Sequence, residues 1–133
     1  MSEPLNVEVV SADRVVWSGT ADSVIARTTD GDIGILPGHS PVLGVLVPSA
    51  VEVRTPDGQR EIVAVDGGFI SVAAGRVSIL SEFAELSGEI SQSDAERDLR
   101  EAERELEAGD ESPEVQQRFQ RAQAQLKAAQ KAS

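Results

Sequence analysis

The feature that most constrains this chain is a change of composition and sequence period near residue 86. Residues 1–86 hold 15 of the 16 valines, all four threonines and nine of the 11 glycines. β-Branched residues suit pleated strands, and frequent glycine divides a chain into short segments. Residues 87–133 hold one valine, no threonine and eight alanines, together with many glutamates and glutamines, which favour helices. The sequence therefore predicts a β-domain over residues 1–86 and a helical segment over residues 87–133.

Three β-hairpins are predicted in the first segment, because short apolar runs flank turn-forming residues. The turns are Ser11–Asp13, Pro56–Gly58 and Ala74–Arg76, and glycine or proline supplies the backbone conformation in the last two. The paired strands are 7–9 with 15–17, 51–54 with 62–65, and 70–72 with 77–79. Short strands that recur with such turns are typical of a sandwich or barrel.

Two amphipathic helices are predicted in the second segment. Apolar residues recur at spacings of three and four, in the sets Ala95, Leu99, Ala102, Leu106 and Val115, Phe119, Ala122, Leu126, Ala129. Ser93 and Glu96 match a capping box for the first helix, Gly109 ends it, and Ser112-Pro113 begins the second. Residues 91–111 carry a net charge of −6 and residues 112–133 carry +3. One narrow stripe on each helix and opposite charges predict an antiparallel helical hairpin that is weakly packed and able to open.

Composition excludes several classes of function. The net charge of −11 repels phosphate backbones, and three Phe and one Trp offer no platform for stacking bases, so we expect no nucleic-acid partner. There is no cysteine for thiolate chemistry, and no apolar run is long enough to span a membrane. The N-terminus lacks the pattern of a signal peptide or of a transit peptide. We therefore expect a soluble protein.

No catalytic or metal-binding motif is found. His39, the only histidine, lies in a turn between two prolines, and Asp30 and Asp32 upstream of it do not have a recognisable metal-ligand spacing. The glycines at 31 and 34, and at 67 and 68, belong to no phosphate-binding loop, and no serine lies in a nucleophile motif. We expect no enzyme, no cofactor and no metal.

Three motifs and the helical tail carry a resemblance to a known family. The motifs are Val9-Val10-Ser11-Ala12-Asp13 with Trp17-Ser18-Gly19, the stretch from Asp30 to Pro41 (DGDIGILPGHSP), and Asp66-Gly67-Gly68-Phe69 followed by Val77-Ser78-Ile79-Leu80. With these motifs, essentially the whole chain resembles the epsilon subunit of F-type ATP synthases, the counterpart of the mitochondrial delta subunit. The resemblance implies a ten-stranded β-sandwich, followed by an antiparallel α-helical hairpin.

The resemblance also implies a function and partners. It implies a non-catalytic central-stalk (rotor) subunit of a rotary proton-translocating ATP synthase, which couples the gamma subunit to the c-ring. Contact with the c-ring is implied for Gly31, Asp32, His39 and Ser40. The hairpin is implied to extend along gamma and inhibit ATP hydrolysis. Arg118, Arg121, Lys127 and Lys131 would then contact the catalytic alpha and beta subunits. The gamma-facing residues are not assigned from the sequence.

The implied location is the cytoplasmic face of a bacterial cell membrane. There the protein would be peripheral and would meet the membrane only through the c-ring.

Some bacterial relatives bind ATP through an Ile/Leu-Asp-x-x-Arg-Ala stretch. In this chain Ser91 replaces the acid of that stretch and Asp94 replaces its arginine. Gln125 replaces a second arginine that the resemblance leads us to expect on the last helix. ATP sensing through this stretch is therefore not expected. The alternative function is a free-standing adaptor whose detachable hairpin binds an unrelated acidic partner.

Overall fold

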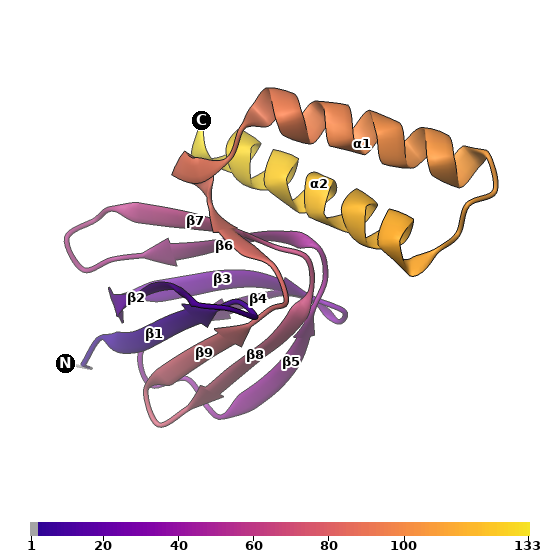
Figure 1. The fold of residues 1–133 in the computed structure, drawn as a ribbon. Coiled ribbons are helices and arrows are strands. Elements are labelled where there is room, and N and C mark those ends of the chain that lie inside the picture. Colours follow the sequence, from indigo (N-terminus) through magenta and orange to yellow (C-terminus); the bar gives the residue numbers. More distant parts are fainter. Residues whose placement is uncertain (1–2) are drawn as a thin grey trace.

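Within the described residues, ten strands form one continuous hydrogen-bonded sheet that folds into two layers, and a two-helix hairpin packs through α2 on the outside of one layer (Figure 1). The computed structural model describes residues 3–133. The order along the sheet is β10-β7-β6-β3-β5-β8-β9-β1-β2, and β4 pairs with β3. The strands are β1 Leu5–Val10, β2 Val15–Ala21, β3 Ser23–Thr28, β4 Gly31–Ile35, β5 Val42–Leu46, β6 Ser49–Arg54, β7 Arg60–Val65, β8 Gly68–Ala73, β9 Arg76–Leu80 and β10 Ala84–Leu86.

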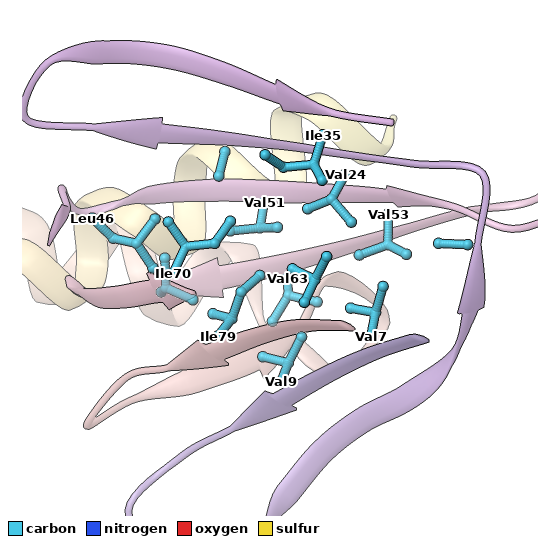
Figure 2. Close-up of a cluster of buried hydrophobic side chains, with 14 of the residues drawn as sticks. Val7, Val9, Val24, Ile35, Leu46, Val51, Val53, Val63, Ile70 and Ile79 are labelled. Carbon is cyan, nitrogen blue, oxygen red and sulfur yellow. The ribbon is translucent and has the colours of Figure 1, made fainter. Parts of the chain in front are cut away.

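The core between the two layers is aliphatic. Alternate residues point inward along β1, β3, β5, β8 and β9. Val9, Val24, Val51, Val63 and Ile70 are fully buried in the core (Figure 2). Valine and isoleucine dominate because the chain has only four aromatic side chains with which to fill the space. This core belongs to the first segment alone, which confirms the predicted sandwich followed by helices.

The three predicted hairpins are confirmed as the antiparallel pairs β1–β2, β6–β7 and β8–β9. β1 also pairs with β9 in parallel, which connects the first hairpin to the third. Local sequence patterns do not predict the strands β3, β4, β5 and β10, which complete the ten-stranded sandwich that the resemblance implies. β10 ends at Leu86 and is followed by the short 3₁₀ helix η1, Ser87–Glu89.

The helical hairpin consists of α1, Gln92–Glu107, and α2, Pro113–Ala132, which run antiparallel (Figure 1). The predicted start of α2 is confirmed, because the Ser112 side chain accepts a hydrogen bond from the Val115 backbone and Pro113 is the first helical residue. The predicted cap of α1 is wrong. The cap is Ser91, whose hydroxyl accepts from the Asp94 backbone N–H, so the helix begins before Ser93.

A second correction concerns α2, for which the sequence predicted a single apolar stripe. Val115 and Ala122 are buried, and Ala124 and Ala128 form a second buried stripe that packs with Ile62 and Ala64 of β7. Glutamine and lysine surround these alanines in the sequence, so the local pattern does not indicate an apolar face there. The hairpin is therefore docked on the outer face of β6 and β7, and the sequence had predicted only the contact between the two helices.

Candidate interaction surfaces

An exposed apolar patch lies on the outer face of the layer that contains β5, β8 and β9. Its members are Leu43, Val45, Phe69 and Leu80, with exposed fractions between 47% and 72%. The strand register makes them neighbours, because Val45 pairs with Phe69 and Phe69 pairs with Leu80. Contiguous apolar side chains on a protein surface typically mark a site for another protein. We call these four residues the apolar patch.

Gly68 lies at the start of β8, where the backbone approaches the end of β9 closely. Gly68 has a φ of +106°, and a Cβ atom at this position would lie 2.0 Å from the carbonyl oxygen of Leu80. Glycine therefore allows β8 to begin in close contact with the end of β9, which places Phe69 outward and Ile70 in the core. The motif Asp66-Gly67-Gly68-Phe69 thus combines a glycine that this close approach requires with Phe69, a member of the apolar patch.

Sequence reasoning missed the apolar patch. Ser71 of β8 and Ser78 of β9 are directly paired. Phe69 and Leu80 lie on the same face as these serines, since strand positions two apart share a face. Phe69 and Leu80 are apolar residues at solvent-facing positions, and this much is present in the sequence. The patch also needs β5 beside β8, and local patterns do not predict that pairing.

The residues implied to contact the c-ring lie at the two ends of β4. Among residues 3–133, this strand pairs only with β3 and forms an edge. Gly31 and Asp32 are its first residues, whereas His39 and Ser40 lie in the turn beyond its last residue. The strand itself extends over roughly 13 Å from Gly31 to Ile35. The structure brings the two pairs onto one edge but does not gather them into a single cluster.

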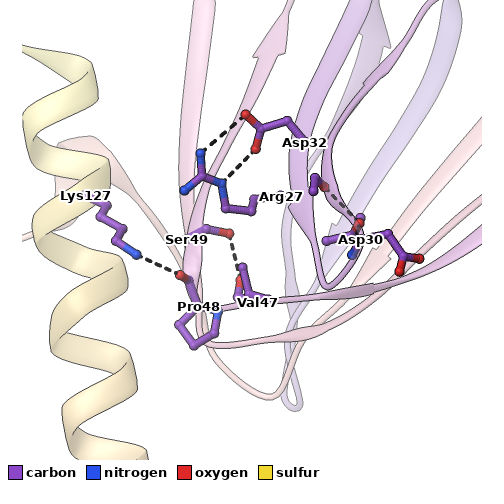
Figure 3. Close-up of polar contacts among 9 residues, drawn as sticks. Arg27, Asp30, Asp32, Val47, Pro48, Ser49 and Lys127 are labelled. Carbon is purple, nitrogen blue, oxygen red and sulfur yellow. Dashed lines mark hydrogen bonds and ion pairs between the residues drawn. The ribbon is translucent and has the colours of Figure 1, made fainter.

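Asp32 is held by an ion pair on the surface. The guanidinium of Arg27 donates to both carboxylate oxygens, at 2.7 and 3.3 Å (Figure 3). The hydrogen bond and charge of Arg27, and to a smaller extent the charge of Lys131, lower the pKa of Asp32. The small stabilisation from this pair is therefore present above the ordinary pKa of aspartate and is lost as pH falls through the lowered value.

The four basic residues predicted to reach catalytic subunits all lie on α2. Three of their side chains contact other parts of this chain: Arg118 pairs with Glu105 of α1, Arg121 pairs with Asp66, and Lys127 donates to the Pro48 carbonyl. The backbone carbonyl of Lys131 accepts from Arg60 at 3.0 Å. The hairpin must give up most of these contacts before its basic face can meet another subunit.

The contact between Arg121 and Asp66 joins the hairpin to a largely buried carboxylate of the sandwich. The Arg121 Nε atom lies 3.2 Å from Asp66 Oδ2, and the Asp66 side chain is only 8% exposed. The guanidinium also lies 5.2 Å from the centre of the Phe83 ring, within the range of a cation–π interaction. Asp66 Oδ1 accepts further bonds from the Ser81 hydroxyl and the Phe83 backbone. These contacts connect α2 to Asp66, the first residue of the motif Asp66-Gly67-Gly68-Phe69.

Residues 90–95, which align with the ATP-binding stretch of some relatives, form the start of α1 and its cap. Ser91 caps α1, and Asp94 in its first turn pairs with Arg97 at 3.4 Å. Gln125, at the position of the second expected arginine, donates to Glu85.

Over residues 3–133, no group of three His, Cys, Asp or Glu side chains is placed to hold a metal ion. No helix in that range is long and apolar enough to span a membrane.

These features define a β-sandwich with an exposed apolar patch and a docked helical hairpin. Residues 4–87 match the family described as the ATP synthase delta/epsilon chain, beta-sandwich domain. The match covers more than half of the 133 residues. The chain belongs to this family, which confirms the resemblance to the epsilon subunit.

Curated relatives agree with this assignment. The ATP synthase epsilon chain of Streptomyces avermitilis is 59% identical over 73 residues, which cover 55% of this chain and 59% of the relative. The ATP synthase epsilon chain of Frankia casuarinae is 61% identical over 70 residues, which cover 52% of this chain and 81% of the relative. The aligned segment thus spans about three fifths of the length of the Streptomyces relative.

Two solved structures share the fold over nearly the whole chain. One comes from the Euglena gracilis mitochondrial ATP synthase (OSCP/F1/c-ring), with a TM-score of 0.76 and 22% identity, covering 97% of this chain and 81% of that chain. The other comes from the central stalk/c-ring of the Tetrahymena thermophila mitochondrial ATP synthase, with a TM-score of 0.57 and 14% identity, covering 98% and 97%. At these identities the likeness establishes the fold.

Proposed function

We propose that this chain is a non-catalytic central-stalk subunit of a rotary proton-translocating ATP synthase. The apolar patch on a sandwich of this family carries the proposal, because it offers a surface for the gamma subunit. Leu43, Val45, Phe69 and Leu80 are the gamma-facing residues in this proposal. The protein would lie at the cytoplasmic face of the cell membrane and would contact the membrane only through the c-ring.

The edge formed by β4 is proposed to face the c-ring. Single cysteines at Asp32 and His39 test each end of this edge separately, since Asp32 lies near the start of β4 and His39 follows its end. We expect disulfide cross-links to a cysteine in the polar loop of subunit c from both positions. Cross-links from Asp32 alone would restrict the contact to the first end, and cross-links only to catalytic subunits would refute the proposed orientation.

The hairpin is proposed to inhibit ATP hydrolysis when it leaves the sandwich. In the docked position, Arg118, Arg121 and Lys127 are occupied by contacts within the chain. In the extended position, these residues and Lys131 would be free to meet acidic segments of the catalytic subunits. The docked contacts therefore compete with inhibition, and a change that weakens them on the sandwich side strengthens inhibition.

Asp66→Asn tests this competition without altering the hairpin. The change removes the charge that holds Arg121 but keeps an oxygen for Ser81 and Phe83. A hydrogen bond to a charged group contributes about 1.5–3 kcal/mol, so we expect the ratio of docked to extended hairpin to fall about tenfold or more. ATP hydrolysis by the assembled complex should then be slower than with the wild-type chain.

Two further variants complete the experiment. Asp22→Asn removes the same charge from an exposed residue that forms no ion pair within residues 3–133, and it should leave the rate unchanged. Deleting residues 87–133 should raise the rate, because no inhibitory segment remains. Equal rates with the wild-type chain, Asp66→Asn and the deletion would refute the inhibitory role while leaving the proposed binding to gamma intact.

A further inference from the structure

A basic pocket lies where α2 meets the outer face of β3 and β6. It is lined by the side chains of Arg27, Asp32, Ser49, Lys127 and Lys131 and by small or apolar residues of the two strands, and it has a volume of about 190 Å³. Figure 3 shows Arg27 and Ser49 on the sandwich and Lys127 on the facing helix. We call this space the junction pocket, because its walls come from both parts of the molecule.

The junction pocket is positive in a strongly acidic protein. Three cations face one carboxylate, which leaves a local net charge of +2, whereas the whole chain carries −11. The nearby carboxylate of Glu52 does not cancel this charge, because it is paired with Arg60 at 2.9 Å and Arg54 at 3.8 Å. Such a local reversal of sign attracts anions.

The cations of the junction pocket retain unused donors. Lys127 forms one hydrogen bond, to the Pro48 carbonyl at 3.3 Å, and an ammonium has three donors. The Lys131 ammonium forms no hydrogen bond or ion pair with any residue from 3 to 133. It lies close enough to Asp32 to lower the pKa of that carboxyl group. Two ammonium groups are therefore available to a ligand that accepts hydrogen bonds.

The direction of α2 opposes anion binding, and a neighbouring residue offsets part of this effect. The C-terminal end of a helix carries a partial negative charge on its last carbonyl groups. Arg60 donates to the Lys131 carbonyl at 3.0 Å and brings a full positive charge to this end of the helix. The field in the junction pocket is then governed by its three cationic side chains.

We infer that the junction pocket binds a small inorganic phosphoanion, such as phosphate or pyrophosphate, between Arg27 of the sandwich and Lys127 and Lys131 of the hairpin. The lining residues include no aromatic ring on which a base would stack, and the volume is below the roughly 300–1,000 Å³ of pockets for larger organic ligands. The pocket lies on the β3–β6 side of α2, whereas Arg121 and Gln125 contact Asp66 and Glu85.

The position of the ligand has a consequence for the hairpin. A phosphoanion that contacts both walls binds only while α2 is docked, so it stabilises the docked state according to its concentration and affinity. This consequence rests on the proposed function only where it concerns inhibition. The binding itself and the protection of α2 are properties of the isolated chain.

Titration of the full-length chain with pyrophosphate at low ionic strength tests the inference. We expect saturable binding, with Lys131→Gln weakening it about tenfold, equivalent to about 1.4 kcal/mol. Asp32→Asn should strengthen binding, because it removes the one carboxylate that lines the pocket. Arg100→Gln is the matched control, since it removes one positive charge from an exposed position on α1 and should leave the affinity unchanged.

Hydrogen exchange of the α2 amides provides a second readout. Pyrophosphate should slow exchange in the wild-type chain and have less effect in Lys131→Gln. Several results would overturn the inference: no saturation below about 10 mM, equal weakening by Arg100→Gln and Lys131→Gln, or binding without slower exchange in α2. ATP binding more tightly than pyrophosphate would also overturn it, because the site would then recognise a nucleoside.

Discussion

Replacing Phe69 with aspartate should abolish binding to the gamma subunit without unfolding the sandwich. The Phe69 side chain is 51% exposed in the free chain, so a charge there remains hydrated and costs little. Within an interface, the same change removes a large apolar contact and buries an unpaired carboxylate. A central aromatic residue typically contributes 2 kcal/mol or more to binding, and about 2.7 kcal/mol corresponds to a hundredfold loss of affinity. Calorimetric titration of purified gamma measures this loss.

Leu36→Asp is the control for this experiment. Leu36 is 62% exposed, more than Phe69, and lies outside the apolar patch. We expect it to bind gamma with nearly the wild-type affinity and both variants to retain the sheet signal in circular dichroism. An equal loss of binding by the two variants would mean that general surface hydrophobicity, and not the apolar patch, determines the affinity. Wild-type affinity for Phe69→Asp would place the gamma contact elsewhere.

Replacing Gly68 with alanine should destabilise the protein severely. The new Cβ atom would lie 2.0 Å from the Leu80 carbonyl oxygen and 2.9 Å from the Ser81 Cα atom, and both neighbours belong to the backbone. Relief of this overlap requires β8 to separate from β9, so we expect a loss of more than about 4 kcal/mol in the free energy of unfolding. Chemical denaturation followed by circular dichroism measures the loss.

Gly58→Ala separates the steric effect from the backbone effect. Gly58 also has a positive φ, +87°, but a Cβ atom there would have no other atom within 4 Å. We expect only the cost of placing alanine in the left-handed region, about 1–2 kcal/mol. If the two variants lost the same stability, the close approach of β8 to Leu80 would not be what requires glycine at Gly68.

The elements that could be predicted from the sequence are those determined by local chemistry. Pro56–Gly58 and Ala74–Arg76 contain turn-forming residues between alternating strands, and Ser112-Pro113 fixes the start of a helix. β4 and β5 could not be predicted in this way, because glycines and a proline-rich turn interrupt their patterns. Their partners are determined by long-range pairing, such as that of β5 with β8.

The candidate sites show a similar division. The resemblance supplied Asp32, His39 and the basic residues of α2, but not their spatial relations. The docked position of the hairpin depends on alanines such as Ala124 and Ala128, which have little hydropathic signal of their own. The apolar patch depends on register across three strands, since Val45, Phe69 and Leu80 are distant in sequence. Information of this kind is not contained in a local pattern.

Recovery of partners from membranes of the source organism is the most direct test of the proposed central-stalk role. The full-length chain, carrying an affinity tag, is incubated with detergent-solubilised membranes beside Phe69→Asp as the matched bait. We expect the wild-type chain to recover gamma together with the catalytic and c subunits of the ATP synthase, and Phe69→Asp to recover none of them. Recovery of an unrelated acidic protein without gamma would contradict the central-stalk role and favour a free-standing adaptor.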